Sequence, residues 1–210
     1  FGTGLSGYLG QDYVGQPAGA VFDKIAVPLL SDIPIIGSIL FKQDALVYIS
    51  YFLVPLAAWY FYKTRSGLFL RAMGENPAAV DAAGINVFGL RYLYIVVGGA
   101  LAGVAGAYLS LAYAPSWLEN MTAGRGWIAV ALVIFALWDP WRAMAGSYLF
   151  GGIDALGFNL QVLGVPVSGF ILNMLPYIFT VLVLVLVLKR RGGRSASPQA
   201  LGLSYDREER

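Results

Sequence analysis

Three long apolar stretches constrain the fold of this chain more than any other feature of its sequence. Residues 45–62, 93–113 and 169–188 contain no Asp, Glu, Lys or Arg. Because an α-helix rises about 1.5 Å per residue, eighteen helical residues reach about 27 Å, close to the ~30 Å hydrocarbon core of a bilayer. Inside lipid every backbone N–H and C=O must be paired, and a helix pairs them within itself. The three stretches therefore predict membrane-spanning helices.

The composition supports a bilayer environment and excludes several kinds of site. Charged residues make up 12% of the 210 residues, whereas an ordinary soluble domain has about 25%. The sequence holds no Cys and no His, which excludes disulfides, Cys/His metal sites and Cys or His catalytic groups. The formal net charge of +2 is too small to indicate nucleic-acid binding. A nucleic-acid partner is therefore not expected.

The sequence offers almost no support for catalysis. It lacks the GxxxxGK[ST] loop that cradles nucleotide phosphates, so any ATP must be bound by a partner subunit. Its carboxylates are scattered along loops and membrane edges, without a close pair and without the spacing typical of metal ligands. We therefore expect the chain not to be an enzyme and to bind no metal and no cofactor of its own.

The topology of residues 121–157 has two interpretations. The apolar run 127–137 has only eleven residues before Asp139 and Pro140 interrupt it. Either two tilted spans meet near 139–142, or a re-entrant hairpin enters and leaves on one face of the membrane. Both alternatives return the chain to its starting side, so the direction of the later segments is the same in each.

The distribution of positive charge predicts the orientation in the membrane. Eleven of the fourteen Lys and Arg residues lie in 63–92, 138–143 and 189–210, and three lie on the other side. Cytoplasmic loops carry the excess of Lys and Arg, so residues 63–92 and the C-terminus are predicted to be cytosolic. Residues 11–44 then lie outside, in apolar pieces too short to cross the membrane.

The predicted fold class is all-α: a polytopic transmembrane helix bundle with a short cytosolic helix and a re-entrant or half-span segment. The transmembrane domain is expected over residues 1–188. Residues 189–210 are predicted to be a disordered cytosolic tail, because 192–210 mix Gly, Ser, Pro and charge without an apolar period. The chain begins at Phe1 in what resembles a helix already under way, so we expect that N-terminal helices are missing.

The loop 63–92 holds a short helix with clear start and stop signals. Asn76 is a favourable N-cap, and Pro77 fits the first helical position. The helix is predicted to continue through 78–83 until Gly84, which suits a left-handed stop. A helix of about seven residues is marginal alone, so neighbouring structure must hold it. The pattern leaves two interpretations open: a membrane-surface connector, or a helix that docks on a partner.

Three separated segments carry recognisable patterns. The loop GLFLRAMGENPAAVDAAGINVFGLRY, residues 67–92, resembles the cytosolic coupling loop of ABC importer permeases of the branched-chain amino acid, ribose and nucleoside superfamily. The segments NMTAGRGWIAVALVIFALWDPWRAMAGSYLFGGIDAL, residues 120–156, and SDIPIIGSILFKQD, residues 31–44, resemble the nucleoside-type branch of that superfamily. The resemblance covers roughly residues 1–188. Family members have several additional N-terminal helices, which agrees with the expectation of a truncated chain.

The resemblance implies partners and a mechanical role for the short helix. In the family, a pair of permeases sits on two cytosolic ATPase subunits, and an extracytoplasmic substrate-binding protein delivers the cargo. The second permease is expected to be a related but different chain. ATP-driven closure of the ATPase pair would push the short helix, which fits a cleft on the ATPase. The residues assigned to ATPase coupling in this way are Arg71, Glu75, Asn76, Pro77, Ala78, Ala79, Asp81, Ala82 and Gly84. The alternative is that Arg71 and Glu75 are solvated surface charges.

Polar residues at membrane depth and one glycine-rich turn are candidates for the substrate pathway. An intramembrane charge costs about 2.5–3.5 kcal/mol on insertion scales, so Asp154 is the sharpest candidate. The TAGRG turn precedes an apolar helix whose N-terminus can meet a polar substrate. The pathway residues expected are Thr122, Gly124, Arg125, Asp154, Asn159 and Asn173, with Gln161 as a further polar position. Alternatively, Asp154 and Asn159 lie at the outer surface and Arg125 extends to water.

The patterns and the resemblance together predict a multi-pass permease subunit of an ATP-driven importer in the cytoplasmic (inner) membrane, with nucleosides as the expected cargo. A monosaccharide or a branched-chain amino acid is the alternative cargo, because related permeases share the coupling loop. An ion-driven secondary transporter would require buried carboxylates or inverted repeats, and neither is recognisable in the sequence. A membrane scaffold that only assembles partners is the remaining alternative.

Overall fold

The computed structural model describes residues 1–31, 33, 37, 40–118, 121, 122, 124–164, 169–190 and 197–207. The chain divides into two compact units, each with its own packing. One is formed by Phe1–Leu53 with Phe88–Ala123, and the other by Val54–Val87 with Gly124–Arg210.

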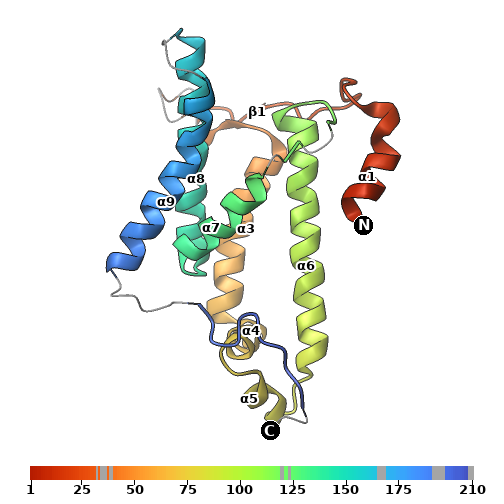
Figure 1. The fold of residues 1–210 in the computed structure, drawn as a ribbon, viewed down its shortest axis with the longest axis vertical. Helices are drawn as coiled ribbons and strands as arrows, with labels where there is room; N and C mark the ends of the chain where they lie inside the picture. The colour runs from red at the N-terminus through yellow and green to blue at the C-terminus, as the bar shows by residue number, and fades with distance from the viewer. Residues whose placement is uncertain are drawn as a thin grey trace. The chain divides into compact units, whose positions relative to one another are not determined.

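The described part of the chain is mostly helical, as the all-α prediction requires (Figure 1). Its only strands are two residues long each. In chain order the elements are α1 (Gly2–Gly10), η1 (Gln11–Tyr13), β1 (Ile25–Ala26), β2 (Lys42–Gln43), α3 (Ala45–Lys63), α4 (Arg65–Glu75), α5 (Pro77–Ala82), α6 (Val87–Tyr108), η2 (Leu109–Tyr113), α7 (Arg125–Ala136), α8 (Pro140–Val162) and α9 (Gly169–Arg190).

Within the described residues, two helices are long and apolar enough to cross a membrane, Ala45–Lys63 and Val87–Tyr113. They agree in length and composition with two of the three predicted spans. The second begins six residues earlier than its apolar run, because no Pro or Gly pair interrupts the helix between Val87 and Arg91. Val87 is fully buried and anchors this end. The third predicted span, 169–188, lies within α9 and stays a prediction.

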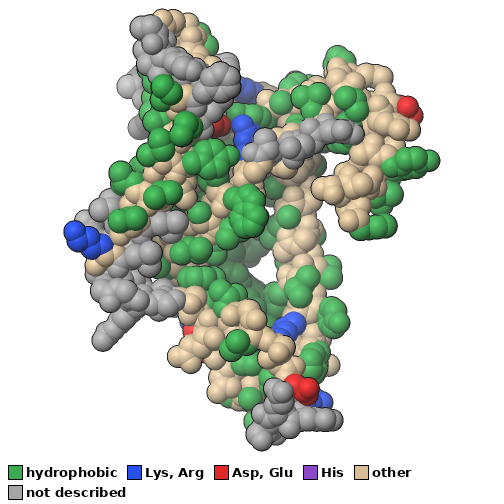
Figure 2. Space-filling view, viewed as in Figure 1, with side chains coloured by type: hydrophobic (Ala, Val, Ile, Leu, Met, Phe, Trp, Pro, Cys, Tyr) green, Lys and Arg blue, Asp and Glu red, His purple; other side chains and the backbone are tan. Residues whose placement is uncertain are grey.

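Almost none of the side chains in the apolar windows of these two helices are buried, which distinguishes them from the core helices of a soluble domain. In α6, Ile95 is 69% and Val96 is 67% exposed. Figure 2 shows hydrophobic side chains spread over the visible face, with few charged ones between them. Helices that are apolar and yet unburied within the chain require lipid or other protein around them.

In the first unit, the segment after η1 folds back along η2 and the residues that follow it. Backbone hydrogen bonds join Gly15 N to Trp117 O at 3.0 Å, and Phe22 N to Leu111 O at 3.1 Å. The β1–β2 hairpin is antiparallel, with Ile25 opposite Gln43. Asp44 then caps α3, since its Oδ1 accepts from the backbone of Leu46 and Val47 at 3.0 and 3.1 Å. The predicted outer segment 11–44 is described only in part.

In the second unit, α7, α8 and α9 pack on one another. Gly146 of α8 allows the close approach of α7: a Cβ there would lie 2.9 Å from Phe135 Cε1. Phe150 of α8 and Phe179 of α9 meet edge to face, with ring centroids 5.7 Å apart. Ala136 and Leu172 are also buried. These contacts form the small apolar core of the unit.

The turn between α7 and α8 falls where Asp139 and Pro140 predict an interruption. Leu137 and Trp138 have left-handed backbone conformations, with φ of +56° and +58°, and α8 starts at Pro140. The twelve residues of α7 reach about 18 Å and the 23 residues of α8 about 35 Å. By length, α7 is too short to cross a bilayer, and α8 is long enough but is not among the helices that are also apolar enough.

Candidate functional site

The α4–α5 corner is built by local capping. Thr64 begins α4, since its Oγ1 accepts from Gly67 N at 3.0 Å. Asn76 ends α4 in an extended conformation and caps α5, with Oδ1 accepting from Ala79 N at 3.1 Å. Pro77 occupies the first turn of α5, where its missing N–H costs nothing. The helix predicted at 77–83 is therefore confirmed as Pro77–Ala82, one residue shorter.

Gly84 closes α5 in the predicted left-handed conformation. Its φ is +81°, and its N–H donates to Asp81 O at 2.9 Å. The next residue, Ile85, donates to Val80 O at 3.3 Å. Val80 is 4% exposed and holds the helix against its surroundings. Because a Cβ at Gly84 would meet nothing within 4 Å, the requirement for glycine is one of backbone conformation alone.

Apart from Gly84, which closes α5, the coupling candidates fall into three groups in the structure. Asn76, Ala79 and Ala82 are exposed, so part of α5 presents small and uncharged groups to the outside. The charged candidates Arg71, Glu75 and Asp81 each contact another part of the same chain: Arg71 lies over the Tyr62 ring, and Glu75 and Asp81 bind residues 199–207. Pro77 and Ala78 are half-buried.

Asp139 ties the end of α3 to the start of α8. Its Oδ1 accepts from Arg142 N at 3.0 Å, which makes it the N-cap of α8. Its Oδ2 accepts from the Tyr62 hydroxyl at 2.8 Å. The Arg142 backbone N–H lowers the pKa of the Asp139 carboxyl below its ordinary value, and the Tyr62 hydroxyl adds to this effect. The Asp-Pro pair signals a helix start in the sequence, but nothing local signals Tyr62 as its partner.

Arg71 extends this connection to α4. Its guanidinium carbon lies 5.2 Å from the centroid of the Tyr62 ring, in cation–π range. Arg71, Tyr62 and Asp139 therefore form a continuous series of contacts from α4, through the end of α3, to the N-terminus of α8. Of these three residues, the sequence predicted a functional role only for Arg71.

Two of the predicted pathway residues meet in the second unit. Arg125, at the start of α7, and Asp154, in α8, form an ion pair at 3.8 Å. Their side chains are 42% and 49% exposed, so the pair contributes little to stability if water surrounds it. Gly124 precedes α7 with φ of +80°, and a Cβ there would lie 3.8 Å from the Tyr177 hydroxyl of α9. Helices α7, α8 and α9 thus come together at Gly124 and Arg125.

The other pathway candidates are placed less informatively. Asn159 is exposed, and its side-chain nitrogen donates to Ala155 O of its own helix at 2.7 Å. Thr122 is exposed in the turn before α7. Gln161 is exposed near the end of α8. Asn173 lies in α9, and its side chain is outside the part of the chain that the structure describes.

Comparison with known proteins matches residues 2–188 to the family described as branched-chain amino acid transport system, permease component. This chain belongs to that permease family. The match spans both units and includes every candidate site residue. The chain is accordingly a permease component of an ABC transporter, and its relatives are integral membrane transport proteins and not enzymes.

Three relatives show what the chain is similar to. It is 38% identical to TsgC13 of Haloferax volcanii, provisionally named a glucose ABC transporter permease, over 99% of this chain and 70% of that protein. It is 41% identical to the nucleoside ABC transporter permease NupC of Lactococcus lactis, over 85% of this chain and 56% of NupC. It is 33% identical to the guanosine ABC transporter permease NupQ of Bacillus subtilis, over 88% of this chain and 57% of NupQ. The chain thus spans little more than half the length of NupC and NupQ, and no solved structure matches it.

Proposed function

We propose that this permease component forms part of a nucleoside pathway and is driven through α4–α5 by a separate cytosolic ATPase. The observation that carries the proposal is the capped α4–α5 insert, which joins two helices long enough to span a membrane. A short helix fixed at both ends transmits displacement instead of absorbing it. The chain contributes movement and a pathway, and the ATPase partner contributes the chemistry of ATP.

The contacts from α4 to α8 supply a route for that displacement. A push on α5 and α4 reaches Tyr62 through Arg71, and Tyr62 is hydrogen bonded to Asp139 at the start of α8. Asp154 lies further along α8, paired with Arg125 of α7. A change in the angle of α8 would therefore alter the Arg125–Asp154 pair. We infer that this pair lines the pathway, where an ion pair can exchange its internal contact for a polar substrate.

The topology that we propose is multi-pass, with 63–92 and the C-terminus in the cytosol. Three observations support it: the excess of Lys and Arg in those segments, the length and apolar character of α3, α6 and α9, and the hydrogen bond of Tyr62 to Asp139. Because Tyr62 lies at the cytosolic end of α3, that hydrogen bond favours a cytosolic α7–α8 turn. It thereby favours two crossings over a re-entrant hairpin, with α7 forming only part of the first crossing.

Nucleosides are the cargo we favour, because two of the relatives are named for nucleoside or guanosine transport. The similarity to TsgC13 keeps a monosaccharide as the second candidate, and the family description keeps branched-chain amino acids as a third. We further infer that the complex contains a second, related permease and an extracytoplasmic binding protein. Selectivity among cargoes then depends on that binding protein as well as on the pathway.

The proposal is tested by reconstituting the full-length subunit in proteoliposomes with its second permease, ATPase and binding protein. ATP hydrolysis is measured against a panel of nucleosides, glucose and leucine. We expect stimulation by nucleosides and none by leucine. Stimulation by glucose alone would move the cargo to monosaccharides and leave the coupling proposal intact. Uptake that proceeds unchanged without the ATPase would refute the ATP-driven mechanism.

A further inference from the structure

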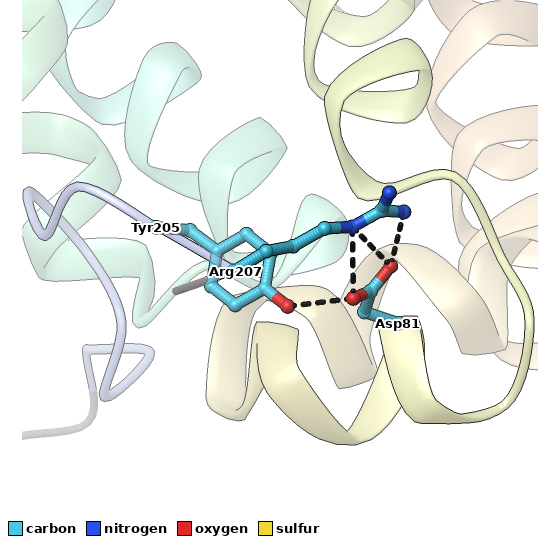
Figure 3. Close-up of polar contacts among 3 residues, drawn as sticks. All are labelled: Asp81, Tyr205 and Arg207. Atoms are coloured by element: carbon cyan, nitrogen blue, oxygen red, sulfur yellow. Dashed lines mark hydrogen bonds and ion pairs between the residues drawn. The ribbon is translucent and has the colours of Figure 1, made fainter. Parts of the chain in front are cut away.

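The C-terminal segment Ser197–Arg207, which we call the strap, lies against both α4 and α5. Its composition predicts disorder, but the structure places these eleven residues in a defined set of hydrogen bonds (Figure 3). The strap also has internal turns, with Leu201 N donating to Pro198 O at 3.1 Å and Leu203 N to Ala200 O at 3.2 Å. Residues 191–196 and 208–210, also predicted to be disordered, lie outside the described residues.

At its first contact, the strap binds the end of α4. Ala200 N donates to Gly74 O at 2.9 Å, which satisfies one of the free carbonyls at the end of that helix. Pro198 packs on Gly74, where an added Cβ would lie 3.2 Å from Pro198 Cβ. Gln199 N also donates to Glu75 Oε2 at 3.4 Å. These contacts use the backbone of the strap and the small size of Gly74.

At its second contact, the strap binds the one charged side chain of α5. The Tyr205 hydroxyl donates to Asp81 Oδ2 at 2.9 Å. Arg207 donates from Nε to both carboxylate oxygens, at 3.1 and 3.0 Å, and from Nη2 to Oδ1 at 2.6 Å (Figure 3). The Asp81 side chain is left 7% exposed. Forked guanidinium–carboxylate pairing of this kind fixes orientation as well as distance.

The two contacts lie on either side of the Asn76 corner, so the strap spans the joint between α4 and α5. The six residues of α5 are too few for a helix to be stable by itself. Its caps fix its ends, and Val80 fixes one side. The strap adds a third constraint, which resists a change in the angle between the two helices. It also occupies Asp81, which is therefore unavailable to another protein while the strap is bound.

We propose that the strap takes part in coupling through α4 and α5, and that Tyr205 and Arg207 are positioning residues that hold α5 at a fixed angle to α4. This inference rests on the proposed function, since it assigns the strap a part in transmitting the motion of the ATPase. A corner held by the strap passes a push on α5 into α4 and the adjoining span. Without the strap the corner bends, and less nucleoside is transported for each ATP hydrolysed.

The structural half of the proposal is tested by electron paramagnetic resonance on the full-length subunit in liposomes. The sequence has no native cysteine, so labels can be placed at Leu68→Cys in α4 and Ala82→Cys in α5 alone. The distance between the two spin labels reports on the angle between the helices. We expect one narrow distance distribution, which broadens in Arg207→Gln and in Asp81→Asn. Gln199→Ala is the matched control, because its exposed side chain is not needed for its backbone contact. An unbroadened distribution in both Arg207→Gln and Asp81→Asn would overturn the proposal.

The functional half is tested in the reconstituted complex as nucleoside taken up per ATP hydrolysed. We expect Arg207→Gln to lower this ratio by about fivefold or more, while the ATPase still co-purifies with the permease. Tyr205→Phe should lower it less, and Arg207→Lys should restore part of the ratio lost in Arg207→Gln. A ratio that is unchanged, or that rises because the strap is a brake, would refute the positioning role. Failure of the wild-type permease to bind an ATPase would instead refute the proposed function, and the distance measurement would still decide whether the strap holds the corner.

Discussion

At Gly84 the backbone conformation, and not the space around it, limits which residue is tolerated. A Cβ would meet nothing within 4 Å, but φ is +81°. A β-branched residue in this conformation costs about 2 kcal/mol. We expect Gly84→Val to unwind the end of α5 and to reduce nucleoside-stimulated ATP hydrolysis several-fold at a normal membrane level. Gly84→Asn is the control, because Asn tolerates the left-handed region. Equal loss in both variants would contradict the conformational explanation.

The Tyr62 hydroxyl gives a second prediction at the residue scale. Tyr62→Phe keeps the ring under Arg71 but removes the donor to Asp139, so we expect a loss of about 1 kcal/mol in stability. The measurement is the thermal unfolding midpoint in detergent. Tyr92→Phe, at an exposed tyrosine of α6, is the control and should leave the midpoint unchanged. A midpoint equal to wild type in Tyr62→Phe would contradict a stabilising role for this hydrogen bond.

The pH dependence of that loss follows from the direction of the Asp139 pKa shift. The pKa of Asp139 is lower in the folded protein than its ordinary value of about 3.9. Its ionised form therefore adds stability above the unfolded pKa, and this is lost as pH falls through the folded pKa. We expect the midpoint difference between wild type and Tyr62→Phe to stay constant from about pH 8 to about pH 5 and to shrink only below the ordinary pKa. A difference that disappears near neutral pH would point to another titrating group.

At the scale of elements, the sharp turn between α3 and α4 depends on Gly67. An added Cβ would lie 2.7 Å from the Phe61 Cα and closer still to the Tyr60 carbonyl, both of them backbone atoms that cannot rotate away. Gly67→Ala should therefore force α4 away from α3 and destabilise the subunit by about 1–3 kcal/mol. The midpoint of thermal unfolding and the amount of nucleoside taken up per ATP hydrolysed should both fall. Ser66→Ala, at the exposed neighbouring position, should change neither; loss in Ser66→Ala would mean that α4 is sensitive for some other reason.

The elements also show which parts of the site can be predicted from sequence. The start and stop of α5 depend on Asn76, Pro77 and Gly84, which act within four residues of the groups they bind, so their pattern is visible in the chain. The strap contacts residues 124 and 126 positions away, and Tyr62 is 77 positions from Asp139. No local pattern encodes pairs at such separations. A Gly, Ser and Pro-rich composition indicates that a segment cannot fold alone, and it does not exclude binding to a neighbouring helix.

At the scale of the whole molecule, the membrane assignment depends on two independent observations. The exposed apolar helices α3 and α6 need a non-aqueous environment, and the family match covers residues 2–188. Sequence reasoning reached the family through the loop 67–92 and the TAGRG segment, because both are contiguous in the chain. It could not pair Arg125 with Asp154, which meet only once α7 and α8 pack. The orientation of the chain in the membrane gives a prediction at this scale.

The absence of native cysteine makes that orientation directly testable. Single cysteines are introduced at Ala79, Leu203 and Asp23, which are all exposed. A membrane-impermeant maleimide is then applied to intact cells and to inside-out vesicles. We expect Asp23→Cys to react only in intact cells, and Ala79→Cys and Leu203→Cys only in vesicles. A permeant maleimide should label all three, which controls for access. Labelling of Ala79→Cys in intact cells would invert the topology and separate α5 from any cytosolic ATPase.

A cysteine at Arg142 distinguishes the two arrangements of α7 and α8. Arg142 lies three residues after Asp139, whose carboxylate binds Tyr62 at the end of α3 that we propose to be cytosolic. If α7 and α8 are two tilted spans, Arg142→Cys faces the cytosol and reacts in inside-out vesicles at a rate close to that of Ala79→Cys. If the pair is a re-entrant hairpin, the position lies within the membrane and is protected from both sides. We expect the first result, because a turn buried in lipid would have to desolvate Asp139 and Arg142 together, and the cost of placing such charges in the hydrocarbon core favours water.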